Sequence, residues 1–229
     1  MNDENALHKI PPRHSSDKII AEQEDEQKPL TPARRQRIES VVRQRQRGLM
    51  VVMESVWNPH NLAAIARSCD AFGVQQLAFT PGHADDEDIK MAGKLSSASA
   101  SKWLDYRVFE EDSSSALTSL KSEGWHLVAT TLSDQAVSIH DIDFTAMDKI
   151  ALLVGNEKDG LSQTAQDLAD THMIIPMLGM VRSFNVSVAT AIALYEINRQ
   201  RALSEQDYAL PHAEADALLK RWLKREYER

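Results

Sequence analysis

The chain has 229 residues, 42% of them hydrophobic, and a formal net charge of −8. Its length suits one α/β domain with extensions, and no apolar run reaches the length of a membrane span or a signal-peptide core, so we expect a cytoplasmic protein that is not in a membrane. A single cysteine excludes an internal disulfide and a cysteine-based zinc or iron–sulfur site, and the scattered histidines show no metal-ligand spacing. The acidic net charge alone argues against nucleic-acid binding, but local patches govern phosphate contact.

The amino-terminal part divides into a polar extension and a basic helix. Residues 1–30 are polar, with several prolines and an acidic run, and we expect them to be largely disordered. The sequence Thr31-Pro32 is typical of a helix start, and a basic helix is predicted through Arg47, within a unit spanning 31–48. The predicted helix contains one acidic residue, and its basic residues are Arg34, Arg35, Arg37, Arg43, Arg45 and Arg47. In an acidic protein such a helix favours contact with a polyanion, and a solvated arginine face is the alternative.

A βαβ unit follows the basic helix. Residues 49–55 form the continuous apolar run of a buried strand, 62–72 fit a helix closed by a glycine, and 74–79 fit a second strand. The first turn lacks a G-x-G-x-x-G pattern, which removes the main sign of a dinucleotide fold. It offers instead Asn61 and, about two helical turns on, Arg67, which we expect broadly on the same side of the helix.

Helix and strand patterns then alternate along the rest of the chain. They are a helix over 112–122, a strand over 125–131, a poorly structured connection over 134–148, a strand over 149–154, a helix capped by Ser162 and ending at 169, a short strand at 174–175, a buried helix capped by Asn185, and an amphipathic helix over 213–227. Residues 80–88 fit an acidic loop, and 91–102 fit a short helix or a loop. We expect an α/β domain over 49–202 and a helical extension over 203–229.

The loop GNEKDGLS, residues 155–162, follows a buried strand. It has two glycines at the spacing of a phosphate-binding loop, but Leu161 stands where the lysine must be, which argues against NTP hydrolysis. A plain glycine-rich turn is the alternative. Glu157 argues against that alternative, because a carboxylate at this place can accept hydrogen bonds from donors on a substrate or from an arginine.

A second polar loop, 176–184, leads onto the buried helix, where Ser183 and Asn185 either cap the helix only or belong to a ligand site. Strand-end loops gather at one edge of an α/β sheet and form its usual binding crevice. The crevice expected here collects Asn61, Arg67, Thr130, Gly155, Glu157 and residues 175–185. It predicts a cofactor-binding protein that acts on a phosphate-bearing substrate, with an arginine able to fork onto the phosphate.

Three segments resemble the motifs of one family. Residues 54–74, ESVWNPHNLAAIARSCDAFGV, resemble the first motif of the SpoU/TrmH family of RNA ribose 2′-O-methyltransferases, in the SPOUT class. Residues 153–162, LVGNEKDGLS, resemble the second motif, and 175–189, IPMLGMVRSFNVSVA, resemble the third. Order and spacing match over about residues 31–200. Two mild departures sit beside the polar residues: Ser68 where the family often has Thr, and Phe184 where Leu is usual.

The resemblance implies a parallel-sheet α/β domain with a deep trefoil knot in its C-terminal half, flanked by N- and C-terminal helices. It implies a homodimer that binds S-adenosylmethionine in the knot, through Thr130, Gly155, Asn156, Glu157, Ile175, Met177, Met180, Ser183 and Phe184. The catalytic residues that it implies are Asn61, Arg67, Glu157, Ser183 and Asn185, with Arg67 contacting the RNA phosphate and assisting removal of the ribose 2′-hydroxyl proton. With RNA as the polyanion, the expected RNA-binding residues are Arg34, Arg35, Arg43, Arg45, Arg47 and Arg67.

Within the family, the flanking segments favour the tRNA branch, which methylates the guanosine at position 18 in the D-loop. The rRNA enzymes often carry a separate N-terminal RNA-binding domain, and residues 1–30 are too few and too polar to form one. One alternative is 2′-O-methylation of another tRNA or rRNA nucleotide. Another is a non-catalytic RNA- or cofactor-binding module of the same fold, against which the intact set of polar motif residues argues.

Overall fold

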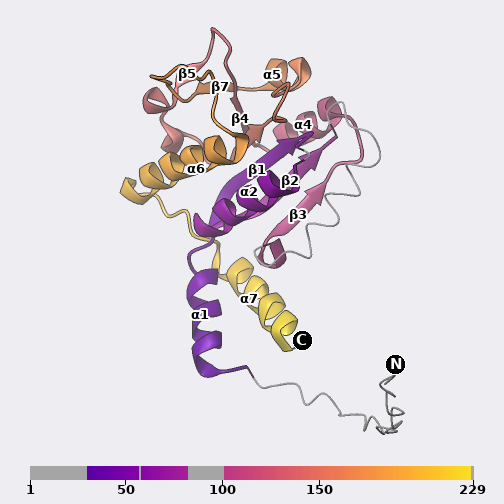
Figure 1. Cartoon of the computed structure of the whole chain (residues 1–229). Helices are drawn as coiled ribbons and strands as arrows, with labels where there is room; N and C mark the ends of the chain where they lie inside the picture. The colour runs from indigo at the N-terminus through magenta and orange to yellow at the C-terminus, as the bar shows by residue number, and fades with distance from the viewer. Residues whose placement is uncertain (1–29, 57, 82–100, 228–229) are drawn as a thin grey trace, which may run out of the picture.

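The computed structural model describes residues 30–56, 58–81 and 101–227. Within them the strands form one seven-stranded, all-parallel sheet in the order β3-β2-β1-β6-β4-β7-β5 (Figure 1). The strands are β1 Gln46–Glu54, β2 Val74–Thr80, β3 Asp105–Val108, β4 His126–Thr130, β5 Val137–Ser138, β6 Ile150–Val154 and β7 Thr171–Ile174. The predicted α/β fold is confirmed, and its sheet is parallel as the resemblance implied.

Helices cover both faces of the sheet. They are α1 Pro32–Val42, α2 Pro59–Ala71, α4 Ser113–Ser122, α5 Gln163–Leu168, α6 Val186–Leu203 and α7 His212–Tyr227, with short 3₁₀ turns η2 Ser101–Trp103, η3 Ile139–Asp141 and η4 Phe144–Ala146. In the described part of the chain no helix is both long enough and apolar enough to cross a membrane. The α2 and α6 helices pack together on one face, and α4 and α5 lie on the other (Figure 1).

The central strand β1 contributes side chains to two hydrophobic cores, one on each face of the sheet. Alternate side chains of a strand point to opposite faces, so Leu49, Val51 and Met53 pack with α2 and α6. Met50 and Val52 pack with α4 and α5. A strand buried on both faces is apolar throughout, which is why the run was recognisable in the sequence.

The predicted helix caps are confirmed. Asn185 accepts a hydrogen bond from Ser187 N, Ser162 accepts one from Ala165 N, and Thr31 accepts one from Arg34 N. Gly73 follows α2 with φ +73°, and a Cβ there would lie 2.4 Å from the carbonyl oxygen of Gln44. Only glycine fits that position. Cys69 packs in the core as expected, and burial raises the pKa of its thiol.

The basic helix is shorter than predicted. It ends at Val42 and not at Arg47, and the first strand begins at Gln46 and not at residue 49. Backbone pairing outside the helix decides this: Gln46 N donates to Gly73 O at 2.8 Å, and Arg47 N donates to Tyr208 O at 2.8 Å. Both partners are distant in sequence, so local helix signals could not reveal them.

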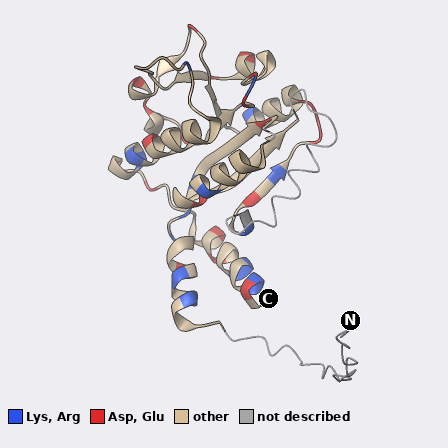
Figure 2. Cartoon of the chain, in the orientation of Figure 1, with Lys and Arg blue, Asp and Glu red and all other residues tan. Residues whose placement is uncertain are grey.

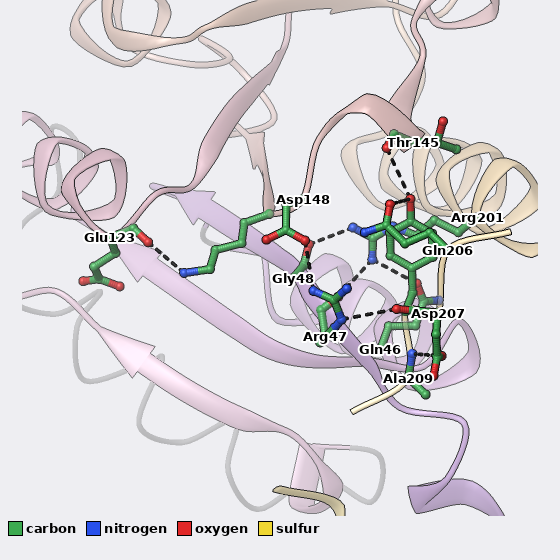
Figure 3. Close-up of polar contacts among 12 residues, drawn as sticks. Gln46, Arg47, Gly48, Glu123, Thr145, Asp148, Arg201, Gln206, Asp207 and Ala209 are labelled. Atoms are coloured by element: carbon green, nitrogen blue, oxygen red, sulfur yellow. Dashed lines mark hydrogen bonds and ion pairs between the residues drawn. The ribbon is translucent and has the colours of Figure 1, made fainter. Parts of the chain in front are cut away.

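The C-terminal segment is anchored where β1 begins (Figure 3). Arg201, near the end of α6 and 4% exposed, donates to the carbonyl oxygens of Arg47 at 3.1 Å and Gly48 at 2.8 Å. Burial lowers the pKa of this guanidinium to about 10. The Arg47 side chain pairs with Asp148 at 2.9 Å, and its guanidinium also donates to the carbonyl oxygen of Asp207. These contacts fix the point from which the chain leaves toward α7.

The helices α1 and α7 form a pair that projects from the sheet domain (Figure 1). They share a small core of Ile38, Val42, Leu218 and Trp222, distinct from the two cores beside the sheet. The amphipathic C-terminal helix was predicted within one residue of its observed start. The expected disorder of the N-terminal extension, and most of the expected loop and serine-rich segment within 80–102, fall outside the described residues.

Candidate active site

A cavity of about 640 Å³ opens at the carboxyl ends of β4, β6 and β7. Its walls come from the loops that follow these strands and from the start of α6. They include Thr130, Leu132, Gly155, Glu157, Lys158, Gln166, Ile175, Met177, Arg182, Ser183, Phe184 and Asn185. This is the sheet edge at which the sequence predicted a crevice, and the volume is that of a small-molecule site.

The loop after β6 is folded tightly against itself. Asn156 and Gly160 exchange two backbone hydrogen bonds of 3.1 Å, and the side-chain oxygen of Asn156 accepts from the backbone N–H of Lys158 at 2.8 Å. A Cβ on Gly155 would lie 2.0 Å from the carbonyl carbon of Gly160. Glycine is therefore required at Gly155, where the chain passes its own loop and presents backbone to the cavity.

A buried carboxylate ties the end of β1 to this loop. Glu54, 3% exposed, accepts hydrogen bonds from Ser162 N at 2.7 Å and from Ser162 Oγ at 2.8 Å. Ser162 Oγ in turn accepts from Ala165 N and caps α5. The sequence analysis did not assign Glu54, although an acid directly ending an apolar strand was a visible signal. The contact joins the first and second motifs.

Asn61 links the other motif residues. Its Nδ2 donates to Glu157 Oε1 at 2.6 Å, and its Oδ1 accepts from Asn185 Nδ2 at 3.1 Å. Asn185 Oδ1 meanwhile accepts from Ser187 N at 2.9 Å, so one side chain both caps α6 and reaches α2. Asn185 therefore caps α6, contacts α2 and lines the cavity, and its role as a site residue stays a prediction. Asn61 is 7% exposed, and a buried side-chain amide needs hydrogen-bond partners, which Glu157 and Asn185 provide.

Most of the residues expected at the cofactor site line the cavity. They are Thr130, Gly155, Asn156, Glu157, Ile175, Met177, Ser183 and Phe184. Met180 does not: its side chain is 100% exposed and lies outside the cavity lining. Residues 177–184 have no regular structure, so the sequence held no periodicity from which the direction of Met180 could be deduced.

Arg67 lies apart from the cavity. It is exposed on α2, does not line the cavity, and makes no hydrogen bond or ion pair with the described residues. The expectation that it shares a side of the helix with Asn61 was wrong. Six helical residues correspond to a rotation of about 600°, which leaves the two side chains about 120° apart.

The predicted RNA-binding arginines have different surroundings. Arg35 and Arg43 are exposed, and Arg34 is partly exposed and pairs with Glu226 at 3.0 Å. In Figure 2 the ribbon is coloured for basic residues at several positions along α1 and toward the end of α7. The prediction that Arg45 binds RNA was wrong. Arg45 is 0% exposed, pairs with Asp70 and lies over the ring of Trp222, so its side chain is not accessible to RNA.

The cavity also has two basic residues that were not predicted from the sequence. The exposed cations Lys158 and Arg182 line it from opposite loops, and no motif pattern distinguished them in the sequence. No cluster of three or more potential metal ligands occurs among the described residues.

Comparisons with known proteins agree on one family. Residues 48–195 match the model of the SpoU rRNA Methylase family. The chain is 40% identical over 195 residues to the tRNA (guanosine(18)-2′-O)-methyltransferase of Escherichia coli K12, covering 83% of this chain and 82% of that protein. The structure resembles the TrmH/SpoU tRNA modifying enzyme of A. aeolicus, with TM-score 0.70, 34% identity, and coverage of 85% of this chain and 96% of that one. It also resembles the SpoU methyltransferase AviRb from Streptomyces viridochromogenes in complex with AdoMet, with TM-score 0.58, 30% identity, and coverage of 70% and 63%.

Proposed function

Because this chain belongs to the SpoU rRNA Methylase family, we propose that it transfers a methyl group from S-adenosylmethionine to a ribose 2′-hydroxyl of tRNA, at the guanosine at position 18 of the D-loop. The named activity of the Escherichia coli relative supports the choice of nucleotide. The flanking helices α1 and α7 support it too, since the match to the A. aeolicus tRNA modifying enzyme covers almost all of that chain.

The observation that carries the proposal is the cavity beside the linked residues Asn185, Asn61 and Glu157. The cavity fits S-adenosylmethionine in size and in chemistry. Backbone groups around Gly155 suit the polar edge of an adenine, and Ile175 and Met177 offer apolar walls to its ring. The complex of the relative AviRb with AdoMet supports the same cofactor here.

Once bound, S-adenosylmethionine supplies a methyl group whose bond to sulfur breaks as a bond to the ribose oxygen forms. The hydroxyl proton must leave at the same time. Glu157, held by Asn61, orients donors on the ribose, and Arg67 binds the neighbouring phosphate and assists the proton's departure. An arginine holds its own proton tightly, so Arg67 acts together with the phosphate and not as an isolated base.

The active form is a homodimer in this proposal. A groove between α2 and α6 is lined by Ala64, Ser68, Ser187, Val188, Ala191, Ile192 and Tyr195. Val188 and Tyr195 are 44% and 58% exposed, and a second copy would bury them. Arg67 precedes Ser68 at this groove, so the dimer contact is also where Arg67 would meet the second copy.

We also propose that the chain forms a trefoil knot and that the protein is located in the cytoplasm. The strand order places β4 between β6 and β7, although β4 precedes both in the chain. The segment from β6 to β7 therefore crosses β4 on the face that α5 covers, and the segment after β7 contacts α2 through Asn185. The proposal of a knot itself rests on the family that the chain belongs to. A tRNA-modifying enzyme works where tRNA is present, which supports the cytoplasm.

The proposal is tested by giving the purified protein methyl-labelled S-adenosylmethionine with either unmodified bulk tRNA or unmodified rRNA. We expect label in tRNA, in a nucleotide whose 3′ bond resists alkali, because a 2′-O-methyl group removes the hydroxyl that attacks that bond. Label confined to rRNA, label in alkali-sensitive nucleotides, or no label would each contradict the proposal.

The dimer is tested separately by light scattering. Replacing Val188 and Tyr195 together by Glu places charges in the groove and should give a monomer, because a buried unpaired charge is costly. A variant that keeps the wild-type mass would place the interface elsewhere, and a monomeric wild type would rule the dimer out.

A further inference from the structure

The α1–α7 pair meets the sheet domain at a junction that decides how its basic surface is aimed. The pair projects from the domain and has its own small core (Figures 1 and 2). Docking of tRNA on this pair is useful only if the target ribose then lies at the cavity. The contacts at the junction therefore bear on the reaction even though they lie far from the reacting atoms.

Arg45 occupies this junction and contacts three elements. Its side chain is 0% exposed, and Nη1 donates to the carbonyl oxygen of Val74, at the start of β2, at 3.1 Å. Nη2 pairs with Asp70 in the last turn of α2, the helix whose first turn carries Asn61. The guanidinium carbon lies 4.9 Å from the ring centre of Trp222 on α7. One side chain thus joins the helix of the site to the helix of the projecting pair.

The contact continues through a cluster of rings and cations. The Trp222 and Trp103 ring centres are 4.7 Å apart with their planes inclined by 53°, and Lys102 Nζ lies 4.3 Å from the centre of the Trp103 ring. Glu226 on α7 adds polar contacts to this cluster: it accepts a hydrogen bond from Lys102 at 3.1 Å and one from Arg34 on α1 at 3.0 Å. Both helices of the pair therefore contact this cluster.

A buried arginine is a poor choice if stability alone is needed. Removing a charge from water costs several kcal/mol, and an apolar side chain of similar volume often packs as well or better. Arg45 Nε finds no hydrogen-bond partner among the described residues, which adds to that cost. A guanidinium held beside an aromatic ring, with its in-plane N–H donors fixed by Asp70 and Val74, instead defines an orientation.

We propose that Arg45 and Trp222 form a positioning contact that fixes the α1–α7 pair relative to the cavity, so that tRNA held on the pair presents its ribose to the methyl donor. This inference rests on the proposed function. Without the contact, fewer molecules hold the pair in the competent orientation. Because tRNA binds through the pair and the cavity together, its binding weakens by that fraction, and the chemical step in a bound complex is unchanged.

The test uses the full-length protein and three variants at the junction. Arg45→Met keeps most of the side-chain volume, and Trp222→Leu puts a smaller apolar side chain in the small core; both remove the cation–ring contact, whereas Trp222→Phe keeps an aromatic face. We expect the KM for tRNA to rise about tenfold in the first two and to stay within about twofold in Trp222→Phe. The kcat at saturating tRNA and the Kd for S-adenosylmethionine should not change.

Trp125→Leu is the matched control, because Trp125 also lies under a cation, Lys149 at 5.8 Å, but in the body of the sheet domain. Its KM for tRNA should equal that of the wild type. Unchanged KM in both Trp222→Leu and Arg45→Met, or an equal rise in the control, would overturn the positioning role. So would a joint collapse of the Tm and of S-adenosylmethionine binding, which would assign the contact to the stability of the whole fold. An inactive wild type would overturn the proposed function, whereas an active wild type with unmoved variants overturns the positioning contact alone.

Discussion

Asn61 is the residue at which the three motifs meet. A buried amide with a donor partner on one side and an acceptor partner on the other has a single favourable orientation, set here by Asn185 and Glu157. Glu157 lines the cavity, and its Oε1 is held by the hydrogen bond from Asn61. Orientation of this kind is what a positioned catalytic carboxylate requires.

Asn61→Asp tests the linked residues. It places a second carboxylate against Glu157, where the present contact is 2.6 Å, and repulsion should push Glu157 out of line. We expect single-turnover methyl transfer to fall about a hundredfold. The control is Asn58→Asp, because Asn58 only caps the same helix and Asp caps equally well. Equal rates for the two variants would show that the Asn61–Glu157 contact is not used.

Arg67→Ala tests the proposed role in proton removal. Arg67 is exposed and makes no polar contact with the described residues, so its loss should leave the Tm within about 2 °C of the wild type. Methyl transfer to saturating tRNA should fall by about two orders of magnitude. Arg67→Lys should restore little, because a point charge does not reproduce a planar fork. Near-normal turnover in Arg67→Ala would remove it from the chemistry.

For the helices and strands, the sequence was sufficient to predict local hydrogen bonds at helix starts, but not backbone pairing between segments that are distant in the chain. The caps at Thr31, Ser162 and Asn185 follow from side chains that accept hydrogen bonds from the first turn of their own helix, so the sequence was sufficient to place them. The end of α1 depends on the partner strand β2 and on the segment at Tyr208, and for that reason Arg45 was taken for a helix-surface residue. The cavity lining was predictable from strand ends, whereas the outward direction of Met180 was not.

Gly155→Ala tests whether the folded loop after β6 builds the cavity. The added Cβ would lie 2.0 Å from the backbone of Gly160, and backbone cannot give way as a side chain can. We expect S-adenosylmethionine affinity, measured by calorimetry, to fall at least about tenfold, together with a lower Tm. Gly179→Ala is the control, since nothing lies within 4 Å of a Cβ there. An unaffected Gly155→Ala would mean that the loop is not needed for the cofactor.

On the scale of the whole molecule, charge distribution matters more than its sum. The chain carries 34 acidic and 26 basic residues, yet α1 and the end of α7 display clustered cations (Figure 2). Counterion release from RNA depends on such local contacts and not on net charge. An acidic protein with a basic projecting pair can therefore bind tRNA through that pair.

Salt dependence measures this contribution. Replacing the exposed Arg35 and Arg43 together by Ala should weaken tRNA binding and reduce the slope of log K against log salt by about 1.5. S-adenosylmethionine binding should be unchanged. Arg35 pairs with Glu39 at 2.9 Å, and Arg107 and Lys121, on β3 and α4, likewise pair with Glu123 and Asp170. The Arg107 and Lys121 double Ala variant is therefore the control for equal charge loss away from the α1–α7 pair. An unchanged slope would make α1 a solvated surface, as the alternative reading held.

We propose that this chain methylates the 2′-hydroxyl of guanosine at position 18 of tRNA. Mapping the methylated nucleotide in an unmodified tRNA transcript after incubation with S-adenosylmethionine, beside a matched tRNA that carries 2′-deoxyguanosine at position 18, tests this directly. We expect one 2′-O-methylated guanosine, at position 18, and no methyl transfer to the deoxy substrate. Methylation at any other position, or equal incorporation into both tRNAs, would contradict it.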